Sequence, residues 1–549
     1  MPGPRLPQIH RNPKYLEERA RRSTDLIALI AFCGFLFFLG LQVIGLVGAD
    51  ETRYAQVARE MLLRHDWVTP VLGGQPWMEK PPLYYWSAML AYRTAGMVID
   101  WAARVPSAVF STLMIFFIYA WARRFRPGTQ LDAALITAAS ALVVGFGRGA
   151  STDMPLTAMF TIAMLCWWGW YASGRRSWLL LFYFFSGLGT LAKGPVAVFL
   201  AALILVVFAL LRRDRRLITR TLWPVGIVVY LAVVLPWFVA VQRANPDFFH
   251  VFIVQHNLAR YATDLYRHKQ PFWYFLPVGM AGLLPWTIFV IEAVVDACRD
   301  WRFSTREPAG KEDLRVYLAL WFLLPILFFS FSQSKLPGYI LPAIPAGTIL
   351  LADFVLHREE LGDKPAAWLA LLHALLCAAM LVGALLAPFK LLHLEVHRNV
   401  WFVAAALAII AILAMWLALR NQGYRSLRFS TLVPVVIAFG LLLRGTAPLI
   451  NLLQSARPVE NALRETALGS IPSVAVYDVP RSVEYGLAFY RNQRISSYER
   501  NEIPPGDHLV VAASGAKSEL EYRLPGRLVT RVGGFAPQHL DFYLVSGSR

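Results

Sequence analysis

The chain alternates between long apolar segments and short polar ones. About thirteen of the apolar segments are long enough to cross a hydrocarbon core of about 30 Å as helices. This pattern predicts an all-α polytopic membrane protein. The predicted spans lie near residues 26–47, 105–122, 130–147, 154–172, 177–192, 195–211, 222–241, 274–293, 316–331, 338–355, 366–386, 400–419 and 430–450.

The periodicity changes in the segment that follows the first predicted span. Residues 50–54 are too polar to continue a membrane helix, and from Ala55 to Leu63 apolar residues recur at helical spacing opposite charged ones. A helix with two such faces is expected to lie in the membrane surface with its apolar side down. A second surface helix is expected within 87–104, before the next span.

The apolar runs end near residue 450, and helical and strand-like patterns alternate beyond it. We therefore predict a transmembrane domain at 1–450 and a small external α/β domain at 451–549. The second domain carries no Ser-His-Asp, metal-binding or Gly-rich phosphate motif. The sequence leaves open whether it caps a cavity, recognises an acceptor or stabilises the fold. Strands are expected near 474–477, 508–511, 527–532 and 542–545, and helices near 456–466 and 482–491.

Composition agrees with a membrane class. The 549 residues are 57% hydrophobic and 16% charged, which is typical of polytopic membrane proteins. The four cysteines lie in predicted spans or at an inner edge, and none belongs to a CxxC pair. We therefore expect neither a disulfide nor a thiolate metal site.

Basic residues mark alternate loops of the predicted topology. By the positive-inside rule these loops and the N-terminal arm are cytoplasmic. An odd number of spans then places the first loop and the C-terminal domain outside. The net charge of +18 is spread over short inner loops, so it does not indicate nucleic-acid binding, for which the sequence has no motif. The basic loops lie near 123–126, 175–176, 212–220, 299–315, 358–364 and 420–428.

The first outer loop gathers carboxylates, cations and aromatic rings at one membrane face. Interfacial charges and Tyr/Trp belts commonly anchor helix ends, so each residue alone has a structural interpretation. The cluster carries more chemistry than a connecting loop needs, because ionisable groups at a membrane boundary usually have partners or a task. Its members are Asp50, Glu51, Arg53, Glu79, Lys80, Tyr84 and Tyr85.

Later outer turns add charged residues at the same level. Asp153 is either the N-cap of the helix that enters at Pro155 or a second functional carboxylate. Arg148 would pair with Asp153 or with an anionic substrate. The lysines of the following turns are either boundary anchors or cavity residues. These turns contain Lys193, Lys335 and Tyr339.

The second outer loop, near 242–274, carries a basic strip with His256, Arg260, Arg267 and His268. Glu79 with His256 or His268 would offer the carboxylate and imidazole ligands of a zinc site. No local ligand spacing supports such a site, and a histidine here also suits a simple hydrogen-bonding role. A divalent metal, zinc or magnesium, is therefore an unsupported alternative, and no cofactor is expected to be required.

Several motifs resemble one known family. DETRY and EKPPLYYW, in this order within one loop, resemble the first external loop of bacterial glycosyltransferases that take a sugar from a polyprenyl-phosphate carrier. The pattern is similar to the aminoarabinose transferases that modify lipid A, distant relatives of protein O-mannosyltransferases. The segments RGASTDMPL, LAKGP and SKLPGYILP are similar to that family as well. The resemblance is strongest at 50–86 and 148–156 and weak after about 450.

The resemblance implies a GT-C fold with inverting transfer of an amino sugar, such as 4-amino-4-deoxy-L-arabinose, from undecaprenyl phosphate to a lipid A phosphate. The reaction would take place at the periplasmic face of a bacterial inner membrane. Asp50 and Asp153 would be the catalytic carboxylates. The donor phosphate would be bound by Lys80, Arg53, Arg260, Arg267 and Tyr339. The cavity would be lined by Glu51, Glu79, Tyr84, Tyr85, Arg148, Lys193, His256, His268 and Lys335.

The charge pattern fits this chemistry. Cations stabilise the charge that develops on a departing phosphate. A carboxylate orients or deprotonates the acceptor, or steadies positive charge on the sugar ring. Neither step needs a nucleotide, which agrees with the missing P-loop and GxGxxG motifs.

Other functions stay open at this stage. The acceptor could be a protein or glycan hydroxyl, for which Asp50 would act as a base, and the sugar could be glucosamine or galactosamine. A transporter of polyprenyl-linked lipids would also need a basic cavity lined with aromatic rings. Transport should place ionisable groups deep in the spans, whereas this chain concentrates them on the outer face. That distribution favours the enzyme.

Overall fold

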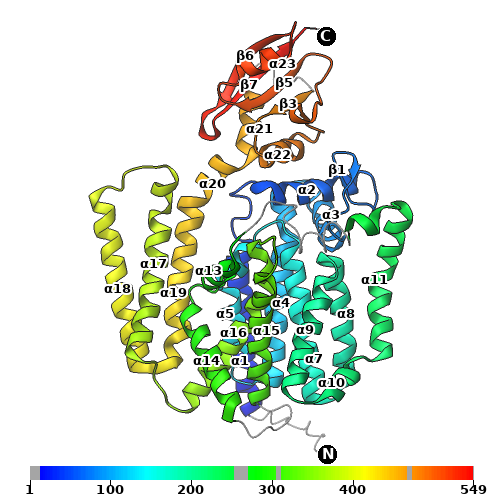
Figure 1. The fold of residues 1–549 in the computed structure, drawn as a ribbon. Helices are drawn as coiled ribbons and strands as arrows, with labels where there is room; N and C mark the ends of the chain where they lie inside the picture. The colour runs from blue at the N-terminus through cyan, green and yellow to red at the C-terminus, as the bar shows by residue number, and fades with distance from the viewer. Residues whose placement is uncertain (1–12, 253–269, 304–310, 467–472, 548–549) are drawn as a thin grey trace, which may run out of the picture.

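The computed structural model describes residues 13–252, 270–303, 311–466 and 473–547. Long helices run roughly side by side, and a small mixed sheet sits beyond one end of them (Figure 1). Within the described residues, six helical stretches are long and apolar enough to cross a membrane, or up to eight if each bent pair forms one span. The predicted all-helical membrane class is therefore confirmed, whereas a count of thirteen spans is not.

Most predicted spans coincide with one helix each. Most boundaries differ from the predicted ones by up to about six residues, because hydropathy locates the middle of a span better than its ends. The predicted span 430–450 differs more, since α19 ends at Leu441 and the chain continues through a π-helix and a further short helix. The helices are α4 (Asp100–Phe125), α7 (Asp153–Ser173), α8 (Arg176–Lys193), α9 (Val196–Leu211), α11 (Pro224–Ala244), α15 (Lys311–Ser330), α16 (Ile344–Glu360), α17 (Ala367–Leu391), α18 (Arg398–Gln422) and α19 (Leu427–Leu441).

The first predicted span, 26–47, differs from the structure. α1 (Pro13–Cys33) begins earlier and continues into the short π-helix η1 (Gly34–Phe38), where the helix ends. Gly40 follows with φ 71°, a conformation that favours glycine. A side chain at Gly40 would also come within 2.7 Å of Leu443. Glycine at position 40 therefore favours the turn, because any other residue would be strained at this positive φ.

Two further segments predicted as straight spans are bent. Segment 130–147 forms α5 (Gln130–Ala138) and α6 (Ala141–Gly147), with a bend of 65° between the two helices. Segment 274–293 forms α13 (Phe275–Gly282) and α14 (Thr287–Phe303), with a bend of 114°. The bends meet, because the Ala141 N–H donates to the Leu284 carbonyl at 3.0 Å. Each break thus satisfies part of the backbone that the other exposes, as a break inside a membrane protein requires.

The predicted surface helix exists as α2 (Gly48–Leu63). It lies across one end of the helix bundle beside α3 (Leu83–Ala95), beneath the sheet (Figure 1). Tyr54, Val57, Ala58 and Met61 recur on one face and are buried against α3 and the start of α4. The hairpin β1 (Val71–Leu72) and β2 (Gln75–Pro76) then leads to the segment with Glu79 and Lys80.

The C-terminal sheet has the order β4-β3-β5-β7-β6. β3 pairs in parallel with β4 and β5, and β7 pairs antiparallel with β5 and β6. The four predicted strands and two predicted helices are confirmed, while the short β4 and α23 gave no sequence signal. The elements are β3 (Val474–Tyr477), β4 (Ser496–Ser497), β5 (His508–Ala513), β6 (Leu528–Phe535), β7 (Leu540–Ser546), α21 (Ala456–Glu465), α22 (Arg481–Arg491) and α23 (Lys517–Arg523).

α22 packs against the side of α2. Arg59 of α2 donates to the Phe489 carbonyl and places its guanidinium 5.7 Å from the centre of the Phe489 ring. Arg457 forms an ion pair of 3.0 Å with Asp100 at the start of α4. The C-terminal elements therefore fix the position of α2, the helix that carries Asp50 and Glu51.

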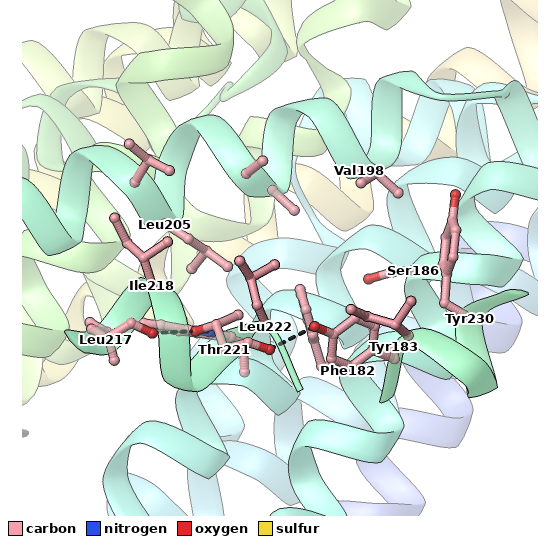
Figure 2. Close-up of a pocket in the computed structure, with 15 residues that line it drawn as sticks. Phe182, Tyr183, Ser186, Val198, Leu205, Leu217, Ile218, Thr221, Leu222 and Tyr230 are labelled. Atoms are coloured by element: carbon pink, nitrogen blue, oxygen red, sulfur yellow. Dashed lines mark hydrogen bonds between the residues drawn. The ribbon is translucent and has the colours of Figure 1, made fainter. Parts of the chain in front are cut away.

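An apolar cavity of about 290 Å³ lies among α7, α8, α9, α10 (Arg215–Thr221) and α11, and Figure 2 shows residues that line it. The polar groups of its lining are hydroxyls and one indole nitrogen, and no charged side chain lines it. A charged sugar phosphate needs cations, so this cavity is not suited to the predicted chemistry. The charged residues meet at the α2 end of the bundle instead.

Candidate active site

The first group of charges lies on and beside the first turn of α2. Asp50 and Arg53 form an ion pair of 2.5 Å, and Glu79 Oε2 lies 3.9 Å from the same Arg53 nitrogen. The Arg53 guanidinium also stacks 5.0 Å from the Trp77 ring centre. The Asp50 side chain is 59% exposed, against 14% for Arg53. Arg53 is thus fixed by its neighbours, whereas Asp50 presents an accessible carboxylate.

Electrostatics keep Arg53 charged. Burial alone would lower the pKa of the Arg53 guanidinium, but Tyr54 and the carboxylates of Glu79 and Asp50 raise this pKa above its usual value. Arg53 is therefore a permanent cation beside two acids.

Glu51 points away from Asp50 and has a structural environment. One of its oxygens accepts from Arg104 Nε at 3.0 Å and from the Ala150 N–H at 2.7 Å. The other accepts from Arg104 Nη2 at 2.6 Å and from the Val47 N–H at 2.8 Å. Glu51 therefore ties the start of α2 to α4 and to the turn before α7.

We predict that Glu51→Ala lowers the stability of the protein. Removing one partner of a buried ion pair typically costs about 3–5 kcal/mol, because the remaining charge is left uncompensated. The apparent Tm in detergent, followed by tryptophan fluorescence, should fall clearly. Asp50→Asn on the same helical turn is the matched control and should leave the Tm unchanged. Equal Tm values for Glu51→Ala and wild type would contradict the structural role.

The second group of charges joins three segments that are distant in sequence. Lys193, at the end of α8, donates to Asp153 at the start of α7, and Ser151 Oγ lies 3.0 Å from the other Asp153 oxygen. The Lys193 ammonium is 5.1 Å from the ring centre of Tyr339 in η4 (Pro337–Ala343). A side chain at Gly338 would come within 2.6 Å of Asp153 Oδ1. Glycine at 338 thus lets η4 reach the carboxylate.

Asp153 is held as a carboxylate. Burial would raise its pKa, but the hydrogen bond and charge of Lys193, the Ser151 hydroxyl and the charge of Lys80 together lower this pKa below its usual value. The alternative that Asp153 is the N-cap of α7 is wrong, since Thr152 is the N-cap and Asp153 is the first helical residue.

Lys80 and Tyr54 connect the two groups. Lys80 is only 8% exposed, and its ammonium donates to the Glu79 carbonyl at 3.2 Å. Burial together with Asp50 and Asp153 raises the pKa of the Tyr54 hydroxyl, with Arg53 opposing. Tyr54 was not predicted as a site residue. Its signal was its position four residues after Asp50, which places both on one helical face.

Four predicted cavity residues besides Glu51 have other environments. Arg148 does not pair with Asp153; it donates to the Leu36 carbonyl at 2.8 Å. Lys335 donates to the carbonyls of Gln270 and Ser332. Tyr84 and Tyr85 are buried in the cluster under α2, because α3 packs its aromatic face inward. Tyr84 donates to the Ala103 carbonyl at 2.8 Å. Neither tyrosine lines an open cavity within the described residues.

The predicted basic strip lies outside the described residues, so His256, Arg260, Arg267 and His268 have no assigned positions here. Within the described part of the chain, no group of three or more His, Cys, Asp or Glu side chains is arranged to hold a metal ion. Both flanks of this strip contact segments that carry site residues. Phe252 packs in a cluster with Leu191, close to Lys193, and the Gln270 carbonyl accepts from Lys335.

The arrangement suits charge stabilisation at a membrane boundary. Accessible and buried carboxylates stand beside cations that are held in place before any substrate binds. Such preorganised charges stabilise a transition state without the reorganisation that water would require. The aromatic rings of Trp77 and Tyr339 lie against two of these cations.

Comparisons with known proteins give consistent matches. The family model for dolichyl-phosphate-mannose-protein mannosyltransferase matches residues 79–239. An undecaprenyl phosphate-alpha-4-amino-4-deoxy-L-arabinose arabinosyl transferase from Erwinia tasmaniensis is 30% identical over 492 residues, which cover 83% of this chain and 86% of the relative. The enzyme of the same name from Pseudomonas aeruginosa is 33% identical over 355 residues. That match covers 63% of this chain and spans 62% of the relative's length.

Solved structures show the same fold. The crystal structure of ArnT from Cupriavidus metallidurans bound to undecaprenyl phosphate matches with a TM-score of 0.76 and 23% identity, covering 95% of this chain and 99% of that chain. The archaeal oligosaccharyltransferase AglB from Archaeoglobus fulgidus matches with a TM-score of 0.51 and 11% identity, over 92% of this chain and 70% of that chain.

Proposed function

The chain belongs to the family of undecaprenyl phosphate-alpha-4-amino-4-deoxy-L-arabinose arabinosyl transferases, and from this membership we propose that it is a membrane glycosyltransferase. Its donor is an amino sugar, such as 4-amino-4-deoxy-L-arabinose, on undecaprenyl phosphate, and its acceptor is a lipid A phosphate. The observation that carries the proposal is the joining of Asp153, Lys193 and Tyr339 beside Lys80. These residues supply both signs of charge without a nucleotide site.

Lys80 binds the donor phosphate in this proposal. Its side chain is buried, and the rings of Pro81 and Pro82 restrict the backbone that follows it. Arg260 or Arg267 is the second cation, which is supported by the contacts of both flanks of their segment with α8 and with Lys335, just before η4. Tyr339 donates its hydroxyl to the same phosphate, with Lys193 against its ring face. Arg53 completes the positive field and is held by Asp50 and Glu79.

The carboxylates act on the acceptor and the sugar. Asp50 is accessible and positions the acceptor phosphate, which is already ionised and needs no base. Asp153, fixed by Lys193 and Ser151, steadies the positive charge that develops on the sugar ring as its bond to phosphate breaks. Transfer from the face opposite the leaving phosphate inverts the anomeric centre.

The topology completes the proposal. The chain crosses the membrane about thirteen times when each bent pair is counted as one span. By the positive-inside rule the N-terminus lies in the cytoplasm, and the α2 end of the bundle then lies in the periplasm. Residues 1–450 form the transmembrane domain and 451–549 the periplasmic α/β domain. Support for the second domain's bracing role comes from the contacts of Arg59 and Arg457.

A second candidate is transfer to a protein or glycan hydroxyl. The match of residues 79–239 to the dolichyl-phosphate-mannose-protein mannosyltransferase model favours it. In that reaction Asp50 would take a proton from the acceptor. Mass spectrometry of lipid A from cells with and without the gene separates the two. A sugar-modified lipid A species that requires the gene supports the first proposal, and unmodified lipid A together with a gene-dependent glycoprotein supports the second.

A single introduced thiol tests the proposed periplasmic location of the C-terminal domain. Tyr522→Cys places a thiol at a position that is 89% exposed on the C-terminal unit. An impermeant thiol reagent should label it in intact spheroplasts. The native Cys298 is an internal control, since it is exposed in the last part of α14, beside the predicted inner loop near 299–315, while the other three cysteines are buried. Cys298 should react only after lysis, and the reverse result would place the site in the cytoplasm.

A further inference from the structure

A second cavity lies apart from the charged cluster, on the other side of the turn that carries Asp153. Its volume is about 370 Å³. Its walls come from η1, α6, α17, α19, the π-helix η6 (Leu442–Thr446) and α20 (Ala447–Gln454), together with Ala139 and Leu284 at the two helix breaks. The cavity therefore lies between the central helices and the group α17–α19, which Figure 1 shows at one side of the bundle.

The lining is apolar except for two polar groups. Arg148 brings a half-buried guanidinium, which lies 5.0 Å from the Phe439 ring centre and donates to the Leu36 carbonyl. Thr446 is 6% exposed, and its hydroxyl has no hydrogen-bond partner within the described residues. A buried hydroxyl without a partner is costly. The Thr446 hydroxyl therefore lacks a partner that a bound molecule would supply, and the Arg148 guanidinium has a carbonyl acceptor but no anion.

The charge of Arg148 is not neutralised by the protein. Within the described residues it forms no ion pair with a carboxylate. Burial, with the nearby Arg104, lowers the pKa of Arg148 to about 10. A cation in an apolar wall is stabilised by an anion, and a guanidinium binds phosphate with two parallel hydrogen bonds.

We propose that this cavity binds one molecule of an anionic glycerophospholipid, phosphatidylglycerol, with its phosphate on Arg148 and one acyl chain between α6 and α19. The site is independent of the proposed sugar transfer. One cation matches one phosphate, and the walls offer room for a single chain. Lipid A, with two phosphates and several chains, does not match this layout. The described lining has no carboxylate that would pair with the amine of phosphatidylethanolamine.

The bound lipid fills the gap between two groups of helices. Its second chain runs along the exposed apolar surface of α19, where Val436 is 38% and Ile437 48% exposed. Its phosphate fixes the first residue of the turn from Arg148 to Asp153. The lipid thus stabilises the packing of α17–α19 and the turn beside the candidate site.

Gly145 offers a variant that blocks the cavity without disturbing the fold. It lines the cavity within α6, and a Cβ there would meet no atom within 4 Å. Gly145→Leu should therefore fold normally and place its side chain where the acyl chain lies. Gly440→Leu is the matched control, because Gly440 on α19 is equally open and does not line the cavity.

The test is native mass spectrometry of the purified, delipidated full-length protein, titrated with phosphatidylglycerol and separately with phosphatidylethanolamine. Wild type should bind one phosphatidylglycerol more tightly than phosphatidylethanolamine. Gly145→Leu and Arg148→Gln should each weaken this binding at least about tenfold, the effect of losing a charge-assisted hydrogen bond or the chain site. Gly440→Leu and Arg243→Gln, an exposed arginine at the end of α11, should bind as wild type does.

Three results would overturn the site. They are unchanged phosphatidylglycerol binding by Gly145→Leu, equal binding of the two phospholipids by wild type, and displacement of phosphatidylglycerol from wild type by equimolar lipid A. Because the readout is lipid binding, failure of the proposed sugar transfer leaves this test intact.

Discussion

Lys80→Ala is expected to lower kcat by about a hundredfold or more with saturating lipid-linked sugar. The donor phosphate gains negative charge as its bond to the sugar breaks, so a cation beside it binds the transition state more strongly than the substrate. Removing one such electrostatic partner typically costs roughly 3–4 kcal/mol. The effect should therefore appear in kcat as well as in KM.

The shape of the cation should matter at this position. Lys80→Arg keeps the charge but replaces a compact ammonium with a planar fork at a residue that is only 8% exposed, so it should retain part of the activity. Lys390→Ala, an exposed lysine at the end of α17, is the matched control and should be fully active. A Lys80→Ala enzyme with kcat close to wild type would show that Lys80 only anchors the loop.

The level of a side chain along the bundle could be predicted from the sequence, because hydropathy marks where helices end. Asp153 and Lys193 stand at two such ends and form an ion pair. Tyr339 stands at a third and lies against Lys193. These contacts follow from three boundaries that are plain in the sequence, together with Gly338, whose missing side chain lets the third segment approach.

The direction of a side chain at that level could not be predicted. Arg148 stands five residues before Asp153, yet it points to Phe439, because its partners, the Leu36 carbonyl and the Phe439 ring, come from segments that are distant in sequence. Tyr84 and Tyr85 have the composition of an interfacial belt, but packing of α3 under α2 buries both. Glu51 and Asp50 are neighbours in sequence, and one helical step of 100° sends them to different partners.

The bends also escaped prediction for a physical reason. An apolar run reports only that a segment avoids water, and a bent pair of helices satisfies that condition as well as a straight one. The break near Ser140 is stabilised by the carbonyl of Leu284 from another segment. No local pattern contains that partner, so tertiary contacts decide the geometry.

Asp50→Asn should remove most of the activity while leaving the fold intact. The Asp50 side chain is 59% exposed, and its ion pair with Arg53 is its side-chain contact in the described structure. Arg53 keeps its contacts with Glu79 and Trp77 when the charge of Asp50 is lost. A carboxylate in the first turn of a helix contributes about 1 kcal/mol or less to stability, so the apparent Tm should stay within the error of the measurement.

The loss of rate then reports what Asp50 does to the acceptor. A carboxylate that takes a proton from a hydroxyl contributes about 10²–10⁴-fold, whereas one that only positions an ionised phosphate contributes at the lower end of this range or below it. Asp247→Asn, an exposed acid after α11, is the matched control and should be fully active. Purified variants assayed with lipid A and with a hydroxyl acceptor distinguish the two roles. Turnover within threefold of wild type by Asp50→Asn on both acceptors would return this residue to a structural role.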